Sequence, residues 1–341
     1  MLTQLQELRL GGCRDLHGRA LLAITALTKL TCLEVNACPH LASIVVPALV
    51  DHLPSLQRLQ LRQLKGDHLE AQLCYVSRLE RLLTLSVDHC TSLPVHEAHQ
   101  PQPVTGAEAG LQFLSCMSQL TMLKGLQLWQ NNANCMNLPG CTVLSKLQLL
   151  TRVSIVSAEC QVADALLQSI AELINLRSLE LCRCATVGSA GLQHMSQLSM
   201  LQNLDLSEAP LIGDEGIEHI AGCTNLLSFR IKSSTISDKS LKIISTFVRL
   251  RNLSLKASAN ITDEGVTLLP QLTCLKILDL ADCILVTDQG LQHLAVMGEL
   301  RQLNLERCRK VTNTGVDKFR TQILAAGPPG FAGSGGIIVF F

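Results

Sequence analysis

The sequence has few aromatic residues and no excess of charge of either sign. Tryptophan, tyrosine and phenylalanine together make up only 3% of the 341 residues, although hydrophobic residues make up 47%. The core must therefore be built from Leu, Ile, Val, Ala and Cys, which indicates a leucine-packed interior rather than an aromatic-rich sandwich. Lys+Arg and Asp+Glu both number 28, so the formal net charge is zero. Because no overall basic field is present, neither nucleic acid nor a membrane surface is predicted as a partner.

The sequence also lacks long apolar segments. Its start, MLTQLQELRL, has no basic stretch followed by an apolar run, so no signal peptide is predicted. No stretch reaches the roughly 18 apolar residues that a membrane-spanning helix needs. Several of the 15 cysteines recur at one position of a repeat, which indicates small buried apolar groups rather than a disulfide framework. These features predict a reducing compartment, which is the cytoplasm or the nucleus.

One pattern, L-x-x-L-x-L-x-x-C, repeats along the chain. Its positions are numbered here from the first leucine, so that the final cysteine is position nine. From Leu123 onward successive units begin 24 to 27 residues apart, and in six of the units position nine is cysteine. A fixed period of roughly 20 to 50 residues indicates a solenoid. The twelve units begin at Leu5, Leu30, Leu56, Leu82, Leu123, Leu150, Leu176, Leu201, Leu226, Leu250, Leu275 and Leu300.

The second half of each unit repeats as well, for example as VTDQGLQHL from Val286. L-x-L predicts a short strand whose leucines point inward, and position nine requires a small buried residue. The Thr/Ser and Asp oxygens are expected to cap the start of a helix, which continues with apolar residues at helical spacing. In this unit Cys283 is therefore expected to fill the core, Asp288 to cap the helix and His293 to face outward.

Each unit is thus predicted to be one strand followed by one helix. Such a unit cannot bury its apolar side alone, and stacking buries that side against the neighbouring units. Because a helix is wider than a strand, the stack is expected to curve. The predicted fold is an α/β solenoid, a horseshoe of about 12 repeats with a concave parallel β-sheet and convex helices.

LxxLxLxxC followed by ITDxGLxxL resembles the cysteine-containing leucine-rich repeat (LRR) of F-box/LRR proteins, in the ribonuclease-inhibitor-like superfamily. The resemblance covers about Leu5 to Phe319, and Cys223, three residues before Leu226, also fits the class pattern C-x-x-L. It implies the substrate-receptor part of an F-box-type (SCF) ubiquitin ligase in ubiquitin-dependent protein degradation. A Skp-type adaptor would then bind only through an F-box outside this chain. The alternative is an LRR scaffold or regulatory protein unrelated to ubiquitin.

Two regions depart from the repeat pattern. Residues 1–319 are predicted to form one LRR domain, with an insertion at about 91–106 that contains the Pro-rich stretch SLPVHEAHQPQPVTG. The insertion is either a tolerated surface loop or part of a working face. Residues 320–341 are rich in Gly and Pro and are predicted to be a disordered tail, with a short membrane-touching segment as the alternative.

No catalytic, cofactor-binding or metal-binding residue is predicted. His96 and His99 have the wrong order and spacing for an HExxH zinc site, and they lie in the polar insertion. Cys182 and Cys184 have no second cysteine pair at zinc-finger spacing; Cys182 is expected to point to the concave surface and Cys184 into the core. Because no Gly-rich phosphate loop and no GxSxG motif occurs either, an enzyme is not expected.

Binding through the concave face is the function that is left. Positions three, five, seven and eight are expected to face outward there, and their charges alternate in sign, which suits a protein or peptide ligand better than a polyanion. Trp129, the single tryptophan, falls at position seven and is either a binding anchor or covered by the insertion. The predicted partner-binding residues are Arg58, Arg62, Trp129, Glu180, Arg183, Asp205, Arg230, Lys232, Lys256, Asp279, Asp282 and Glu306.

Overall fold

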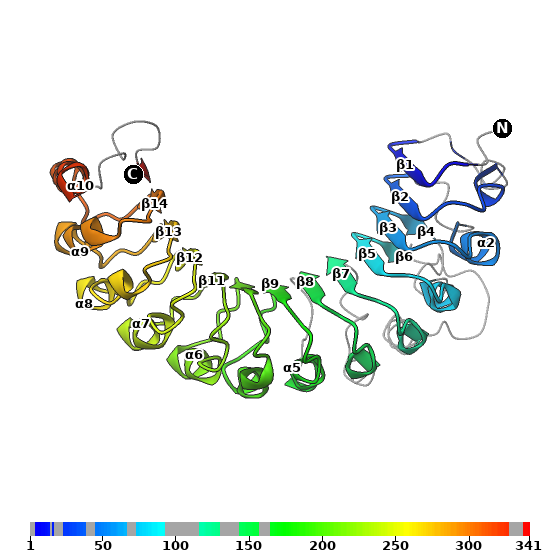
Figure 1. Ribbon diagram of the computed structural model, residues 1–341, viewed down its shortest axis with the longest axis horizontal. Helices are drawn as coiled ribbons and strands as arrows, with labels where there is room; N and C mark the ends of the chain where they lie inside the picture. The colour runs from blue at the N-terminus through cyan, green and yellow to red at the C-terminus, as the bar shows by residue number, and fades with distance from the viewer. Residues whose placement is uncertain are drawn as a thin grey trace, which may run out of the picture. The chain divides into compact units, whose positions relative to one another are not determined.

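The chain forms two compact units of parallel strands and helices. The structure, a computed structural model, describes residues 4–13, 16, 23–38, 45–66, 73–92, 116–129, 143–156, 164–326 and 337–341. The two units are Met1–Leu176 and Arg177–Phe341. In each unit the strands form one layer and the helices lie behind it (Figure 1). Most of the predicted insertion, residues 93–106, lies outside the described residues.

Among the described residues of the first unit, six parallel strands lie side by side in one sheet, each from a different repeat. Neighbouring strands pair in register, so that Leu33 lies between Leu8 and Leu59. The strands are β1 (Glu7–Gly11), β2 (Cys32–Asn36), β3 (Arg58–Arg62), β5 (Thr84–Asp88), β7 (Gly125–Trp129) and β8 (Arg152–Val156). The helical segments are α2 (Val45–His52), η2 (Cys74–Arg78), η3 (Met117–Gln119) and α5 (Asp164–Ala171). A separate small sheet pairs β4 (Lys65–Gly66) with β6 (Thr91–Ser92).

The described part of the second unit contains seven parallel strands, which also follow one another in chain order. They are β9 (Ser178–Cys182), β10 (Asn203–Ser207), β11 (Ser228–Lys232), β12 (Asn252–Ser254), β13 (Ile277–Asp279), β14 (Gln302–Asn304) and β15 (Ile338–Phe340). The helical segments are η6 (Ala190–Gln197), α6 (Asp214–His219), α7 (Asp238–Ile244), α8 (Asp263–Val266), η7 (Leu269–Gln271), α9 (Asp288–His293), η8 (Leu294–Val296) and α10 (Asn313–Ala326). The predicted α/β LRR fold is confirmed.

The repeat leucines form the core, as their spacing predicts. In the repeat that begins at Leu275, the side chains of Leu275, Leu278 and Leu280 are fully buried. Each such burial contributes roughly 1.5–3 kcal/mol relative to an exposed side chain. Cys283 at position nine is also fully buried, and its thiol donates a hydrogen bond to the carbonyl of Leu255 in the preceding repeat (Sγ···O 3.3 Å). The small residue at position nine therefore fills the core and bonds to the neighbouring repeat.

The Thr-Asp pair of each repeat has two separate roles. The Thr287 hydroxyl caps helix α9 by accepting a hydrogen bond from the Gln289 N–H at 3.1 Å. Asp288, which the sequence predicted as a cap, does not cap this helix. Its carboxylate instead accepts from the N–H and the hydroxyl of Thr312, one repeat further along, both at 2.7 Å. His293 is exposed, as expected. The same bond to the next repeat joins Asp214 to Ser237, Asp238 to Thr262 and Asp263 to Thr287.

This contact between repeats explains the glycine of the motif T-D-x-G. A Cβ atom on Gly290 would lie 2.3 Å from Oδ1 of Asp263, which is too close for any real side chain. The ninth repeat has Ser240 at this position, and the Ser240 hydroxyl donates to Oδ1 of Asp214. A side chain here must therefore displace the carboxylate or, as in Ser240, bond to it.

Two elements lie among the described residues of the predicted C-terminal tail, and the predicted disorder of residues 320–341 stays a prediction. Helix α10 runs on from Asn313 to Ala326, because the chain reaches its first helix-breaking Gly-Pro segment only after that residue. β15 pairs with β14, with bonds from the Ile338 N–H to the Arg301 carbonyl (2.9 Å) and from the Leu305 N–H to the Phe340 carbonyl (2.8 Å). The apolar IIVFF stretch, which has a high β propensity, thus forms a strand beside β14. The domain boundary at residue 319 stays a prediction.

Candidate partner-binding surface

The side chains at positions three, five, seven and eight form what is called here the strand-lined face. Positions three, five and seven alternate with the buried leucines and so point away from the core. Position eight follows the strand and takes a left-handed backbone, with φ of 59° at Arg183 and 62° at Asp282. Its N–H continues the ladder, since the Arg183 N–H donates to the Ser207 carbonyl at 3.0 Å. Non-glycine residues pay roughly 1–2 kcal/mol for this conformation, and no sequence signal indicated it.

Charged residues on this face of the first unit pair with one another. The Arg58 guanidinium lies 2.8 Å from the Glu7 carboxylate, and the Arg62 guanidinium lies 3.8 Å from Glu34. Arg9 also reaches Glu34, at 3.8 Å. Arg58 and Arg62 were predicted, whereas Glu7, Arg9 and Glu34 were missed. The same position rule finds all three once it is applied to the first two repeats.

Trp129 is less free than an exposed anchor would be. Its ring is only partly exposed at the end of β7, and its indole N–H donates to the Ser154 hydroxyl on β8 (Nε1···Oγ 2.7 Å). The apolar rim of the ring is therefore what a partner can contact. Cover by the insertion stays untested, because residues 93–106 lie outside the described part of the chain.

Charged residues of the second unit also pair between neighbouring repeats. Glu208 lies between Arg183 and Lys232, at 3.2 Å and 3.6 Å. Arg230 lies 3.7 Å from Asp205. Asp282 and Arg307, at position eight of consecutive repeats, are 2.8 Å apart. These partly exposed pairs are each worth roughly 1 kcal/mol or less, so a partner with matching charges can exchange them at low cost.

Three predicted residues have different surroundings. Asp279 accepts hydrogen bonds from the Ser254 hydroxyl and from the Ala281 N–H, both at 3.1 Å, so it also supports the local backbone. Lys256 and Glu306 form no ion pair with any residue that the structure describes. These two charges are therefore the most available to a ligand.

Glu180, Cys182 and Asp205 form a cluster on this face that sequence analysis did not indicate. One potential ligand atom from each lies within 4.8 Å of the others. Burial raises the pKa of the Cys182 thiol, and the Asp205 and Glu180 carboxylates raise it further, so the thiol stays protonated and donates toward Glu180. A metal needs the thiolate, and Asp205 already accepts from the N–H and hydroxyl of Ser207. The cluster is therefore better explained as a hydrogen-bonded group than as a metal site.

The buried cysteines have no reactive character. Burial raises the pKa of the Cys283 thiol to about 12 and that of Cys308 to about 11. The Cys308 thiol donates to the Leu280 carbonyl at 3.0 Å. Cys184 is buried and Cys182 is partly exposed on the strand-lined face, so their opposite orientation is confirmed. Neither Cys283 nor Cys308 is placed to act as a nucleophile or a metal ligand.

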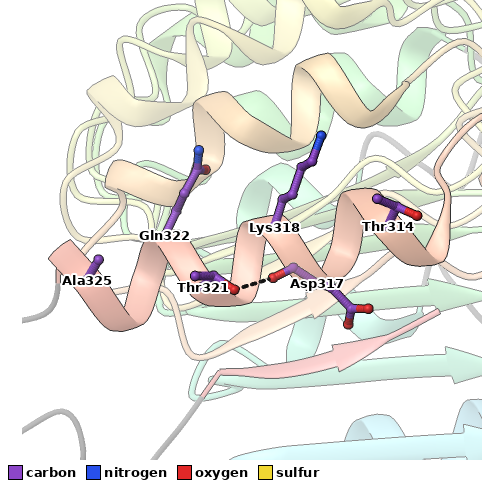
Figure 2. A pocket seen from close by; sticks show the side chains of 6 residues that line it. All are labelled: Thr314, Asp317, Lys318, Thr321, Gln322 and Ala325. Carbon is purple, nitrogen blue, oxygen red and sulfur yellow. Dashed lines mark hydrogen bonds between the residues drawn. The ribbon is translucent and has the colours of Figure 1, made fainter.

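A surface pocket lies on helix α10 (Figure 2). All six lining residues come from this one helix, and the Thr321 hydroxyl donates to the Asp317 carbonyl at 2.8 Å. One side of a single helix cannot surround a small molecule, so the pocket of about 440 Å³ does not compete with the strand-lined face as a functional site. The residues that line this pocket are Thr314, Asp317, Lys318, Thr321, Gln322 and Ala325.

None of the described helices is both long and apolar enough to cross a membrane.

Stacked strand–helix repeats with buried leucines and an outward row of paired charges define a leucine-rich-repeat architecture. A family model described as Leucine Rich repeat matches residues 197–221 and 271–295. Those two stretches fall in repeats that the period had predicted. The finer assignment to the cysteine-containing F-box class stays a prediction, and a search of curated proteins found no match.

Two solved structures share the fold. One is an internalin, InlF, from Listeria monocytogenes, with a TM-score of 0.59 and 17% identity; the match covers 95% of this chain and 86% of that chain. The other is a chain of the Rad7–Elc1 complex from yeast, with a TM-score of 0.56 and 18% identity; the match covers 93% of this chain and 83% of that chain. At such low identity these likenesses show the fold alone.

Proposed function

We propose that the chain recognises a protein or peptide partner on its strand-lined face without catalysing a reaction. The observation that carries the proposal is the set of charge pairs between neighbouring repeats, such as Arg183 with Glu208 and Arg230 with Asp205. The parallel sheet holds these side chains in fixed rows, so a partner of mixed charge can replace one pair member by its own group. Complementary charges of this kind favour specificity and fast association.

We further propose that the bound partner is a substrate of an F-box-type ubiquitin ligase. The support is the LxxLxLxxC and ITDxGLxxL motifs, which resemble repeats of F-box/LRR proteins. A chain with a similar fold is part of the complex of the two proteins Rad7 and Elc1. The ligase function requires a Skp-type adaptor, which an F-box outside this chain would recruit. A scaffold unrelated to ubiquitin is the competing function.

We also propose that the protein works in a reducing compartment, the cytoplasm or the nucleus. The support is that the described cysteines are free thiols, and several of them, such as Cys184 and Cys223, are buried in the core. Oxidising compartments favour paired cysteines in secreted domains.

Affinity purification followed by mass spectrometry tests the proposed function. The bait is the wild-type chain or the triple variant Arg183→Ala/Arg230→Ala/Lys232→Ala, and the matched control removes Lys239 and Lys242 on the helix side of the same unit. We expect the triple variant to lose the partner and the control to keep it. Equal recovery by both variants contradicts recognition on this face. A Skp-type adaptor and a cullin recovered with the product of the full-length transcript support the ligase function, and their absence favours the scaffold.

Trp129 is tested separately once a partner is known. Trp129→Ala removes the ring, whereas Ser154→Ala removes only its hydrogen-bond partner. If Trp129 is an anchor, Trp129→Ala weakens binding by about thirtyfold or more, because binding hot spots of this type contribute about 2 kcal/mol or more. Ser154→Ala is expected to weaken it less. A Trp129→Ala chain that is less stable but binds with unchanged affinity rules the anchor out.

A further inference from the structure

The second unit ends at an open sheet edge. Within the described residues β15 pairs with β14 and with no further strand. The Ile338 N–H and the Phe340 carbonyl bond inward to the β14 side of the sheet. Because successive residues of a strand direct their backbone groups to opposite sides, Val339 presents its N–H and carbonyl to the open side. Unpaired backbone groups along an edge form a template for another strand.

Apolar side chains lie beside this edge on the strand-lined face. Ile338 and Phe340 are 50% and 47% exposed. Ile277 is 38% exposed and lies in the same row as Ile338, with Gln302 of β14 between them. At positions three and five of β9 to β14, all of them described, Ile277 is the single apolar residue. At these two positions of the second unit the apolar side chains thus lie only on its last strands, and exposed apolar clusters of this kind mark interaction sites.

At positions three, five, seven and eight of the last two repeats the charges are mainly negative. Glu306 is exposed, and no described residue forms an ion pair with it. Asp279 lies on β13 in the same row as Asn304 and Phe340. Asp282 is the third carboxylate, and Arg307, which pairs with it, is the only cation at the outward positions of these last two repeats. A ligand with positive charge therefore complements this end of the face.

We propose that the outer edge of β15 is a strand-addition site for an extended protein segment that carries apolar residues and a Lys or Arg at every second position, all on one side of the segment. The Val339 backbone groups pair with the segment's backbone, while its apolar side chains contact Ile338 and Phe340. Its cationic side chain comes at the next alternate position and so lies on the same side, toward Glu306, which is two residues beyond Asn304 of β14. This inference rests on the proposed function, since it names the place on the face and the chemistry of the partner. Backbone pairing provides affinity and alternate side chains provide specificity in such complexes.

Selection from a random peptide-display library on the immobilised full chain tests the proposal. We expect the enriched peptides to carry apolar residues at two alternate positions and Lys or Arg at the next alternate position, so that all three lie on one side. Val339→Pro removes one outward N–H and leaves both bonds to β14 intact, and proline is tolerated on edge strands. We expect this variant, and separately Ile338→Ser/Phe340→Ser, to weaken the selected peptides by about tenfold or more in fluorescence anisotropy, which corresponds to about 1.4 kcal/mol.

A charge variant with a matched control completes the experiment. Glu306→Lys is expected to weaken the basic peptides, whereas Glu218→Lys, which changes an exposed acid on helix α6, is expected to leave them unchanged. An unchanged thermal melt of Val339→Pro shows that the variant is folded. If its melt is altered, the double serine variant decides instead, because it alters only exposed side chains.

Several results overturn the proposal. They are the enrichment of acidic peptides, no enrichment at all, and affinities that neither Val339→Pro nor the serine variant changes. Light scattering that shows a dimer of the wild type and a monomer of Val339→Pro identifies a second copy as the occupant, which also overturns it. Peptides that are lost only on Arg183→Ala/Arg230→Ala/Lys232→Ala refute strand addition but leave the proposed function standing. Loss of the affinity-purified partner on that triple variant, tested independently, decides the proposed function.

Discussion

The carboxylate of Asp263 accepts two hydrogen bonds from Thr287, which lies one repeat further along the chain. The Thr287 N–H lies 2.8 Å from Oδ1, and its hydroxyl lies 2.6 Å from Oδ2. Thr287 uses the same hydroxyl oxygen to accept the Gln289 N–H and so caps helix α9. One aspartate therefore fixes the helix start of the following repeat, and the stacking of repeats depends on polar contacts as well as on leucines.

Asp263→Ala is expected to lower the free energy of unfolding by about 2–3 kcal/mol, because a hydrogen bond to a charged group contributes about 1.5–3 kcal/mol and this site is partly exposed. Glu264→Ala, at the exposed neighbouring acid, is expected to cost less than about 1 kcal/mol, since only its interaction with the helix start is lost. Urea denaturation followed by circular dichroism compares the two. Equal losses contradict a specific contact between repeats.

Gly290→Ala is expected to destabilise the protein by about 1–3 kcal/mol, because the new methyl group collides with the Asp263 carboxylate. Gly298→Ala is the control, since a Cβ there meets nothing within 4 Å. Gly290→Ser is expected to cost less than Gly290→Ala, because its hydroxyl can donate to the carboxylate as Ser240 does to Asp214. Thermal melts of the three variants check this order. A Gly290→Ala chain as stable as Gly298→Ala shows that the site has room.

Ser258→Cys is expected to raise the free energy of unfolding by about 1–2 kcal/mol, because an unpaired buried polar group costs about that much. Ser258 occupies position nine, and its buried hydroxyl has no hydrogen-bond partner among the described residues. The cysteines at the same position, such as Cys283, donate to the preceding repeat. Ser258→Ala serves as the comparison and should gain less, since it leaves space unfilled. A loss of stability in Ser258→Cys, measured by denaturant unfolding, contradicts the explanation.

Cys274 is expected to react with iodoacetamide much faster than Cys223 in the folded protein. Cys274 is exposed, whereas Cys223 is buried and burial raises the pKa of its thiol to about 11. At about pH 8 the buried thiol is therefore both protonated and shielded, and the thiolate is the reactive form. Mass spectrometry of digested peptides measures the rates, and labelling in urea shows that both thiols react once unfolded. Equal rates in the folded protein refute the buried position.

Asp214→Asn is expected to flatten the acid side of the stability–pH curve. Burial by itself would raise the pKa of Asp214, but hydrogen bonds from Ser237 and Ser240 outweigh it, so its pKa is lowered from 3.8. A lowered carboxyl pKa contributes stability that is fully present above the unfolded value and is lost as the pH falls through the folded one. Urea midpoints measured from about pH 6 down to about pH 3 test this. Parallel curves for wild type and Asp214→Asn contradict the lowered pKa.

Local patterns were sufficient for the repeat itself. The spacing of leucines such as Leu275, Leu278 and Leu280 predicts which residues the stack must bury, because alternation along a strand admits one inward face. Cys283 was correctly placed by its size. The hydroxyl of Thr287 was correctly placed as a cap, since a cap contacts an N–H only two residues away.

Contacts over longer distances could not be predicted in the same way. Asp288 resembles a cap in sequence but bonds to Thr312, a residue 24 positions away. The backbone at Arg183 is left-handed, and its N–H bonds to the Ser207 carbonyl of the next repeat. This conformation follows from pairing in the sheet, since arginine has no preference for it. The alternating charges were predicted, whereas their mutual pairing depends on which residues the strand register places side by side.

By itself, the sequence determined that this protein is a stack of strand–helix repeats with leucine and cysteine in its core. Periodic burial is a local property, and each unit carries it. The tertiary structure decided which contacts join neighbouring repeats and which side chains lie together on their outer face. The aspartate contacts between repeats, the charge pairs and the β15 edge beside Ile338 and Phe340 all depend on residues far apart in the chain, whose positions only the stacking brings together.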